Sequence, residues 1–161
     1  MPEKKKLPEL PPIDPDLELR VYSVRSLGQT LSEIEGIGPA LFERLRAIGV
    51  KNRRDLLVHG ATPKGRKAIA DGSGINSKQI LEWVSHVDLY RINGVGSEYA
   101  DLLEAAGVDT VPELSQRNPE NLHQRLLEIN AQKHLVRRNP SIDQVRDWVE
   151  QARKLPRVIT Y

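Results

Sequence analysis

Two short stretches of the chain have the residue types and spacing needed to hold an anion. A glycine between helices permits backbone angles that a Cβ resists, so the turn is tight and leaves main-chain N–H groups uncovered. The helix that follows adds its own free N–H groups and the positive end of its dipole. Such a turn is a candidate site for one phosphate oxygen, and backbone donors alone cannot distinguish bases. The two stretches are Gly36, Ile37 and Gly38, and, in a weaker form, Gly94, Val95 and Gly96.

Basic side chains are concentrated after the first glycine pair. Between residues 51 and 67, Asp55 is the only acidic residue among several lysines and arginines. Polyanion binding usually needs a patch of this kind. A solvated helix face gives the same pattern in one dimension, so both interpretations stay open. The candidate nucleic-acid-binding side chains are Arg44, Lys51, Arg53, Arg54, Lys64, Arg66 and Lys67, and a second basic cluster comprises Lys133, Arg137 and Arg138.

An internal duplication positions both glycine pairs at equivalent places. Residues 31–56 match residues 89–114 at an offset of 58, and the later segments around Trp83 and Trp148 match at an offset of 65. Each repeat is therefore about 60–70 residues long, and two repeats occupy the chain from about residue 30 to 155. Apolar residues recur at helical spacing after each glycine pair, and Gly49 and Gly107 end these helices. Further helices are expected around 52–58, 63–70, 110–116 and 119–129, and the two tryptophans are expected to anchor the core.

The pattern hydrophobic-x-Gly-hydrophobic-Gly between two short helices is the signature of the helix-hairpin-helix motif. Residues 31–57 and 89–114 resemble the helix-hairpin-helix modules of DNA-repair proteins, of the RNA polymerase alpha C-terminal domain and of recombinase N-terminal domains. Residues 89–153 most resemble an uncharacterised bacterial family with tandem units, catalogued as a domain of unknown function. The resemblance implies an all-α fold of two tandem helix-hairpin-helix (SAM-like) small bundles. It also implies phosphate contacts from the main chain of both glycine stretches.

The sequence departs from the DNA-binding members of that group after each glycine pair. Those members commonly carry Lys or Arg one or two positions after the second glycine, whereas this chain has Pro39-Ala40 and Ser97-Glu98. Glu98 falls in the first helical turn, where its carboxylate compensates the helix dipole and repels a phosphate. The second turn is therefore expected to be structural or to face a basic partner. Close packing of two helices is the alternative role for both glycine pairs.

The expected organisation has four parts. Residues 1–29 form a proline-rich extended N-terminal arm, 30–88 the first unit, 89–155 the second unit and 156–161 a C-terminal tail. Residues 17–24 and 157–161 alternate apolar and polar side chains, which predicts two short terminal strands. Frayed tails are the alternative for both segments.

Several classes of function are disfavoured by what the sequence lacks. The chain has no cysteine, which removes disulfides and thiolate metal sites. Its four histidines have no metal-ligand spacing, so neither a metal site nor a cofactor is expected. No catalytic motif is recognisable, which predicts that the protein is not an enzyme. No apolar run approaches the roughly 20 residues of a membrane span, and no export signal is recognisable, which predicts a cytoplasmic protein.

Two functions fit these observations. The first is non-enzymatic, sequence-non-specific binding of duplex DNA through the first glycine turn and the 51–67 cluster. The second is a protein–protein adaptor or scaffold that uses the helical bundles and the proline-rich arm. Residues 89–130 carry a net charge of −4 and residues 131–161 a net charge of +4, which would supply complementary patches for such an adaptor.

Overall fold

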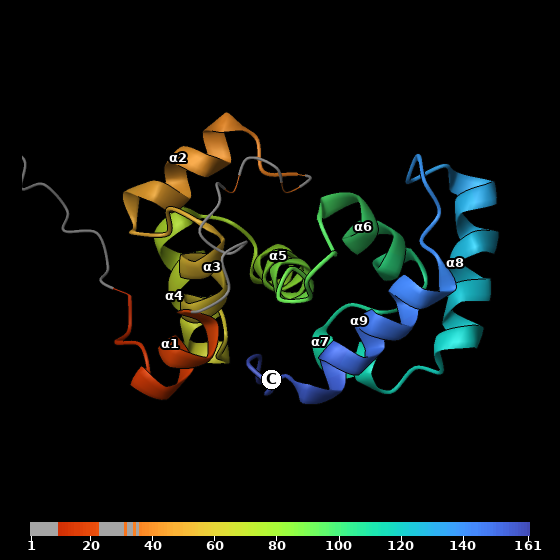
Figure 1. Cartoon of the computed structure of the whole chain (residues 1–161). Helices are drawn as coiled ribbons and strands as arrows, with labels where there is room; N and C mark the ends of the chain where they lie inside the picture. Colours follow the sequence, from red (N-terminus) through yellow and green to blue (C-terminus); the bar gives the residue numbers. More distant parts are fainter. Residues whose placement is uncertain (1–9, 23–30, 32–33, 35) are drawn as a thin grey trace, which may run out of the picture. The chain divides into compact units, whose positions relative to one another are not determined.

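The regular secondary structure of the described residues is entirely helical (Figure 1). The computed structural model describes residues 10–22, 31, 34 and 36–161. The expected all-α class is confirmed, and the helices predicted around 52–58, 63–70, 110–116 and 119–129 are present. The helices are α1 (Pro15–Tyr22), α2 (Pro39–Ala47), α3 (Arg53–His59), α4 (Pro63–Ser73), α5 (Ser77–Leu89), α6 (Ser97–Ala105), α7 (Val111–Ser115), α8 (Pro119–Lys133) and α9 (Ile142–Lys154).

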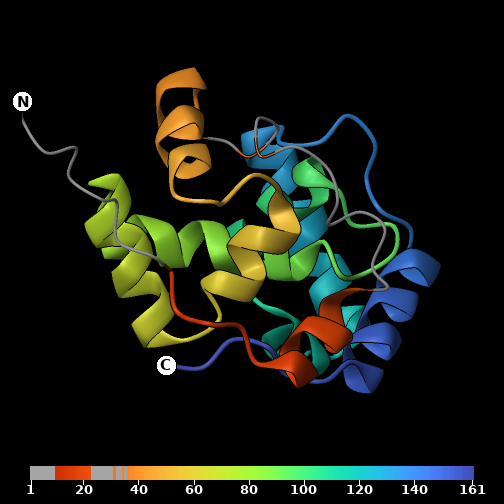
Figure 2. The same ribbon diagram turned by 90° about the vertical axis from the view of Figure 1, so that its left-hand side faces the viewer.

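The chain divides into two compact units. The first unit runs to Val84 and also includes Val158–Tyr161, and the second unit comprises Ser85–Arg157. The division falls inside α5, four residues before the boundary expected from the sequence repeat. In the first unit α1 packs against α3 and α2 against α4, and in the second unit α9 packs against α7 and α8 (Figures 1 and 2).

Local signals in the sequence explain where most helices begin. Asn52 and Thr62 cap α3 and α4, because their side-chain oxygens accept the N–H groups of Asp55 (2.8 Å) and Gly65 (3.0 Å). Asn118 caps α8 in the same way, and Ser141 forms a complete capping box with Gln144 at the start of α9. Proline occupies one of the first two positions of α2, α4, α7 and α8, where its missing N–H costs no hydrogen bond.

Each unit encloses an aliphatic core with one tryptophan. Trp83 is 3% exposed in the first unit and Trp148 is 1% exposed in the second, so the expectation that both are core anchors is confirmed. Other helix side chains of these cores are fully buried: Leu45, Leu56, Ile69 and Ile80 in the first unit, and Leu103, Leu114, Leu126 and Val145 in the second.

A buried ion pair fixes the chain just before the second glycine turn. Arg91 donates to the Asp88 carboxylate at 2.9 Å and to the Pro156 carbonyl at 2.6 Å. The second oxygen of Asp88 accepts the N–H of Val111 at 2.9 Å, which ties the end of α5 to the start of α7. Because both charged groups are nearly inaccessible to solvent, loss of either partner would strand a charge in the interior.

The expectation of terminal strands is wrong for the residues that the structure describes. Residues 17–22 belong to α1, because the Asp14 side chain caps the first turn and Pro15 fits the start of a helix. The extended arm expected over 1–29 is therefore helical over Pro15–Tyr22, while residues 1–9 and 23–29 lie outside the described residues. Residues 156–161 form neither a strand nor a frayed tail. Val158 and Ile159 are buried, and Thr160 N–H donates to the Ala61 carbonyl at 2.8 Å.

Among the described helices, none combines the length and the apolar character required to span a lipid bilayer.

Candidate functional site

The two glycine turns have the same backbone structure. Gly36 has a φ of +90° and Gly94 a φ of +94°, values in the left-handed region that favours glycine. In both copies the apolar residue after that glycine donates its N–H to a carbonyl three residues earlier at 3.1 Å. Ile37 and Val95, the residues in question, are buried and their N–H groups are used inside the turn, so neither offers a free donor to a ligand. The duplication seen in the sequence therefore extends to the hydrogen bonds of the turns.

The helices that follow the turns also end alike. Gly49 and Gly107 have φ values of +97° and +87°, which close α2 and α6 in left-handed caps. The next residue of each copy, Val50 or Val108, donates back to a leucine carbonyl of the helix at 2.9 Å. The turn, the helix and its cap thus form one rigid element that occurs twice.

A tryptophan lies next to the first glycine of each turn and crowds that glycine in the second copy. A Cβ added to Gly36 would lie 3.5 Å from Trp83 Nε1, and a Cβ added to Gly94 would lie 3.1 Å from Trp148 Nε1. The positive φ therefore favours glycine at both positions, whereas the close approach disfavours a Cβ only at Gly94, because 3.5 Å at Gly36 is an ordinary van der Waals contact.

The second glycine of each pair faces open space. Gly38 and Gly96 are the N-cap residues of α2 and α6, and a Cβ on either would have no heavy atom of the described residues within 4 Å. Neither helix has a side-chain cap, unlike α3, α4, α8 and α9. Because glycine has no side chain, neither N-cap residue can itself accept the first N–H groups of its helix. Two exposed, glycine-capped helix starts are what a main-chain anion site requires.

The predicted basic side chains fall into two groups. Arg44, Lys51, Lys64 and Lys67 are exposed and Arg54 is half-buried, so these five remain candidates for contact with a polyanion. Lys67 lies 3.7 Å from Asp71 in a solvent-exposed ion pair, which holds it only weakly.

Two arginines of the predicted basic patch are buried, which corrects the expectation that their side chains contact nucleic acid. Arg66 is 7% exposed and its guanidinium donates to the carbonyls of Gly60 (2.9 Å), Ala61 (3.1 Å) and Thr160 (2.8 Å). Arg66 therefore attaches the C-terminal residues to the first unit. Burial lowers its pKa, against a smaller opposing effect of Tyr161. Arg53 is 3% exposed at the start of α3, so it too contributes no exposed charge.

The second turn has basic neighbours that the sequence did not reveal. The hydroxyl of Tyr99, in the first turn of α6, donates to the carbonyl of Arg138 at 3.1 Å. The segment that carries Arg138 is held in place by Asn130, whose amide exchanges hydrogen bonds with the main chain of Val136 at 2.9 and 3.1 Å. The exposed residues Arg137 and Arg138 thus belong to a segment that contacts the helix following the second turn. These residues are about forty positions apart in sequence, so no local pattern indicates the contact.

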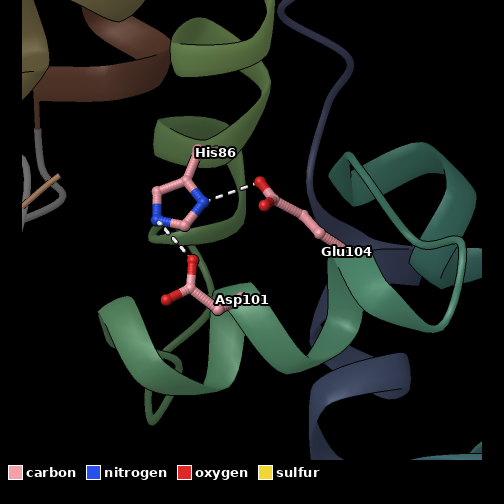
Figure 3. Close-up of side chains that lie close together, drawn as sticks. All are labelled: His86, Asp101 and Glu104. Atoms are coloured by element: carbon pink, nitrogen blue, oxygen red, sulfur yellow. Dashed lines mark hydrogen bonds and ion pairs between the residues drawn. The ribbon is translucent and has the colours of Figure 1, made fainter. Parts of the chain in front are cut away.

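A histidine and two carboxylates that the sequence analysis did not connect lie close together in the second unit (Figure 3). His86 lies in the last turn of α5, and its Nδ1 is 2.6 Å from Oε1 of Glu104. Its Nε2 is 3.8 Å from Oδ1 of Asp101. The structure turns both carboxylates toward His86. Their separation of three positions on a helix was the available signal, but nothing local indicates that the end of α5 faces them.

These features define an all-α protein with two copies of one glycine turn and helix. The family model of a domain of unknown function (DUF4332) matches residues 35–155, about three quarters of the chain, so the chain belongs to this family. No solved structure gives a significant match.

Proposed function

We propose that the protein binds nucleic acid without sequence preference, through two turns of the helix-hairpin-helix type. The observation that carries the proposal is the pair of exposed N-cap glycines, Gly38 and Gly96, each at the start of a helix without a side-chain cap. Each turn offers main-chain N–H groups and the positive end of a helix dipole to one phosphate oxygen. A site built from main-chain donors contacts the backbone of a nucleic acid and ignores its bases.

Exposed cations support the proposal in both units. Arg44, Lys51, Lys64 and Lys67 supply positive charge in the first unit, and Arg137 and Arg138 supply it in the second. Such side chains add the salt-dependent attraction that dominates non-specific binding of nucleic acids. Glu98 opposes binding at the second turn, so the first turn is expected to contribute more affinity. The prediction that the protein is not an enzyme is part of this proposal.

A carboxylate placed inside a turn tests the proposal without threatening the fold. Gly38 has a φ of −81° and Gly96 a φ of −97°, which any residue adopts, and neither position is crowded. Aspartate is a favourable N-cap residue, so Gly38→Asp and Gly96→Asp are expected to fold at least as stably as the wild type. The new carboxylate would accept the N–H groups intended for phosphate and would repel the ligand. We expect Gly38→Asp to weaken binding of a fluorescent duplex at least about tenfold, and Gly96→Asp to weaken it less.

The chain supplies matched controls for this test. Asn76 caps the start of α5 by accepting the N–H of Lys78 at 2.8 Å, and Asn118 caps α8 by accepting the N–H of Asn121 at 2.9 Å. Asn76→Asp and Asn118→Asp therefore add the same charge at a helix start outside the turns and leave the cap in place. Fluorescence anisotropy with two duplexes of different sequence would compare all four variants. Equal loss of affinity in the turn variants and in the controls would contradict the proposal.

A further inference from the structure

The cluster of His86, Asp101 and Glu104 belongs to the second unit and is separate from the proposed phosphate contacts. The side chain of His86 is 6% exposed, whereas those of Asp101 and Glu104 are 29% and 32% exposed. The histidine thus forms the buried wall of the cluster and the two carboxylates form its solvent-facing side (Figure 3). Solvent reaches the carboxylates but not the imidazole.

The short contact of His86 Nδ1 with Glu104 determines whether Nε2 carries a proton or a lone pair in the neutral ring. A distance of 2.6 Å between Nδ1 and the Glu104 carboxylate is a hydrogen bond in which the ring donates, because the carboxylate only accepts. In the neutral ring, Nε2 then carries a lone pair that is directed toward Asp101. Nε2 is buried and has no hydrogen-bond partner among the residues that the structure describes.

In the neutral ring this lone pair and the Asp101 carboxylate repel each other unless a metal cation lies between them, and a proton on Nε2 is the alternative. The distance of 3.8 Å from Nε2 to Asp101 Oδ1 is too long for a hydrogen bond. It suits a metal bridge, because bonds of about 2.1 Å to each atom would meet at an angle of about 130°. A movement of about 0.4 Å would bring that angle to the tetrahedral value. The Glu104 carboxylate on Nδ1 corresponds to the outer partner that metal-ligating histidines ordinarily have.

The other copy of the repeat shows that this arrangement is not required by the fold. At the offset of 58 residues, Asp101 corresponds to Glu43 and Glu104 to Arg46. In α2 these two residues pair with each other, at 3.9 Å. In α6 both positions are acidic, and both carboxylates lie near the ring of His86.

We propose that His86 and Asp101 bind a first-row divalent cation such as Zn²⁺, and that Glu104 orients the imidazole. One nitrogen and one carboxylate oxygen form a mixed ligand set that suits Zn²⁺ better than Mg²⁺ or Ca²⁺. The remaining coordination positions face the solvent side of the cluster and are filled by water or by an oxygen ligand. Glu104 is a positioning residue, since it acts on the metal through the ring.

Isothermal titration calorimetry of the whole 161-residue chain with ZnCl₂ at about neutral pH tests the site. We expect one Zn²⁺ per chain. His86→Gln should abolish binding, Asp101→Asn should weaken it at least about tenfold, and Glu104→Gln should weaken it roughly 10- to 100-fold. The two carboxyl variants keep the size of the side chain at partly exposed positions, so they test the site even if His86→Gln disturbs packing. Circular dichroism would establish that each variant is folded.

Two controls and one spectroscopic measurement separate this site from adventitious binding. Glu43→Gln removes the carboxylate at the equivalent position of the first copy. His134→Asn removes an exposed histidine, and asparagine tolerates the left-handed backbone angles of that position. Both should bind Zn²⁺ within about twofold of the wild type. In ¹⁵N NMR spectra of the imidazole, Zn²⁺ should shift Nε2 of His86 as a ligand, with Nδ1 still protonated. A folded protein without saturable Zn²⁺ uptake, equal uptake by the Asp101→Asn variant, or an imidazolium ring unaffected by Zn²⁺ would overturn the proposal.

Discussion

The two glycines of the second turn should respond in opposite directions to substitution. In Gly94→Ala, an alanine would have to adopt the φ of +94°, and its Cβ would lie 3.1 Å from Trp148 Nε1. The left-handed region costs an L-residue about 1–2 kcal/mol, and the contact with a buried indole adds to that cost. In Gly96→Ser the backbone is already compatible, so loss of unfolded-state entropy should stabilise by about 0.4–1 kcal/mol. The new hydroxyl should add a few tenths of a kcal/mol as an N-cap.

One tryptophan in each unit provides the assay for this pair. In a Trp83→Phe background, the fluorescence of Trp148 reports unfolding of the second unit alone. Urea titrations should show Gly94→Ala at least about 1 kcal/mol less stable and Gly96→Ser about 0.5–1 kcal/mol more stable than their common parent. The reasoning would be refuted if Gly94→Ala were neutral or if the two substitutions shifted stability in the same direction.

The remaining predictions concern charge in the first unit and the response to salt. Arg66→Met should destabilise the first unit by about 2–4 kcal/mol, since three carbonyls lose their donor. Lys67→Met should weaken duplex binding with little change in stability to urea. The reverse pattern would show that Arg66, not Lys67, contacts the duplex. Burial holds the pKa of His59 below its usual 6.5, against a smaller opposing effect of Asp55. The unfolded state therefore binds the proton first, and stability should decline as the pH falls below about 6.5; His59→Gln should lessen that decline in urea titrations, and an identical pH profile for the variant would count against this assignment. Raising the salt concentration from about 50 to about 200 mM should weaken duplex binding at least about tenfold for two phosphate contacts, and a salt-independent affinity would contradict a phosphate-based mode.

The helices and turns could be predicted because their signals are local. Cap residues, helix-start prolines and the positive-φ glycines act within a few positions of the chain, so the sequence indicates them directly. The terminal strands failed for a related reason. The alternating pattern that begins at residue 17 is compatible with a strand or with a short helix. The cap at Asp14 and the proline at position 15 favour the helix.

The side-chain contacts that matter most could not be read from the sequence. Whether Arg66 is exposed depends on the carbonyl of Thr160, which lies 94 positions away. The contact of Tyr99 with Arg138 joins α6 to the segment between α8 and α9, and that of His86 with Glu104 joins α5 to α6, at sequence separations that no motif encodes. A basic cluster in a sequence therefore overestimates the charge available at the surface.

The most direct measurement of the central claim is an NMR titration of the ¹⁵N-labelled protein with a short DNA duplex. If main-chain amides of the turns hold phosphates, the largest amide shifts should come from residues 36–38 and Ala40, since Pro39 has no N–H, with smaller shifts at 94–98. Inorganic phosphate at higher concentration should move the same resonances. The absence of shifts in both turns, or shifts confined to other helix surfaces, would contradict the account and favour the protein-adaptor alternative.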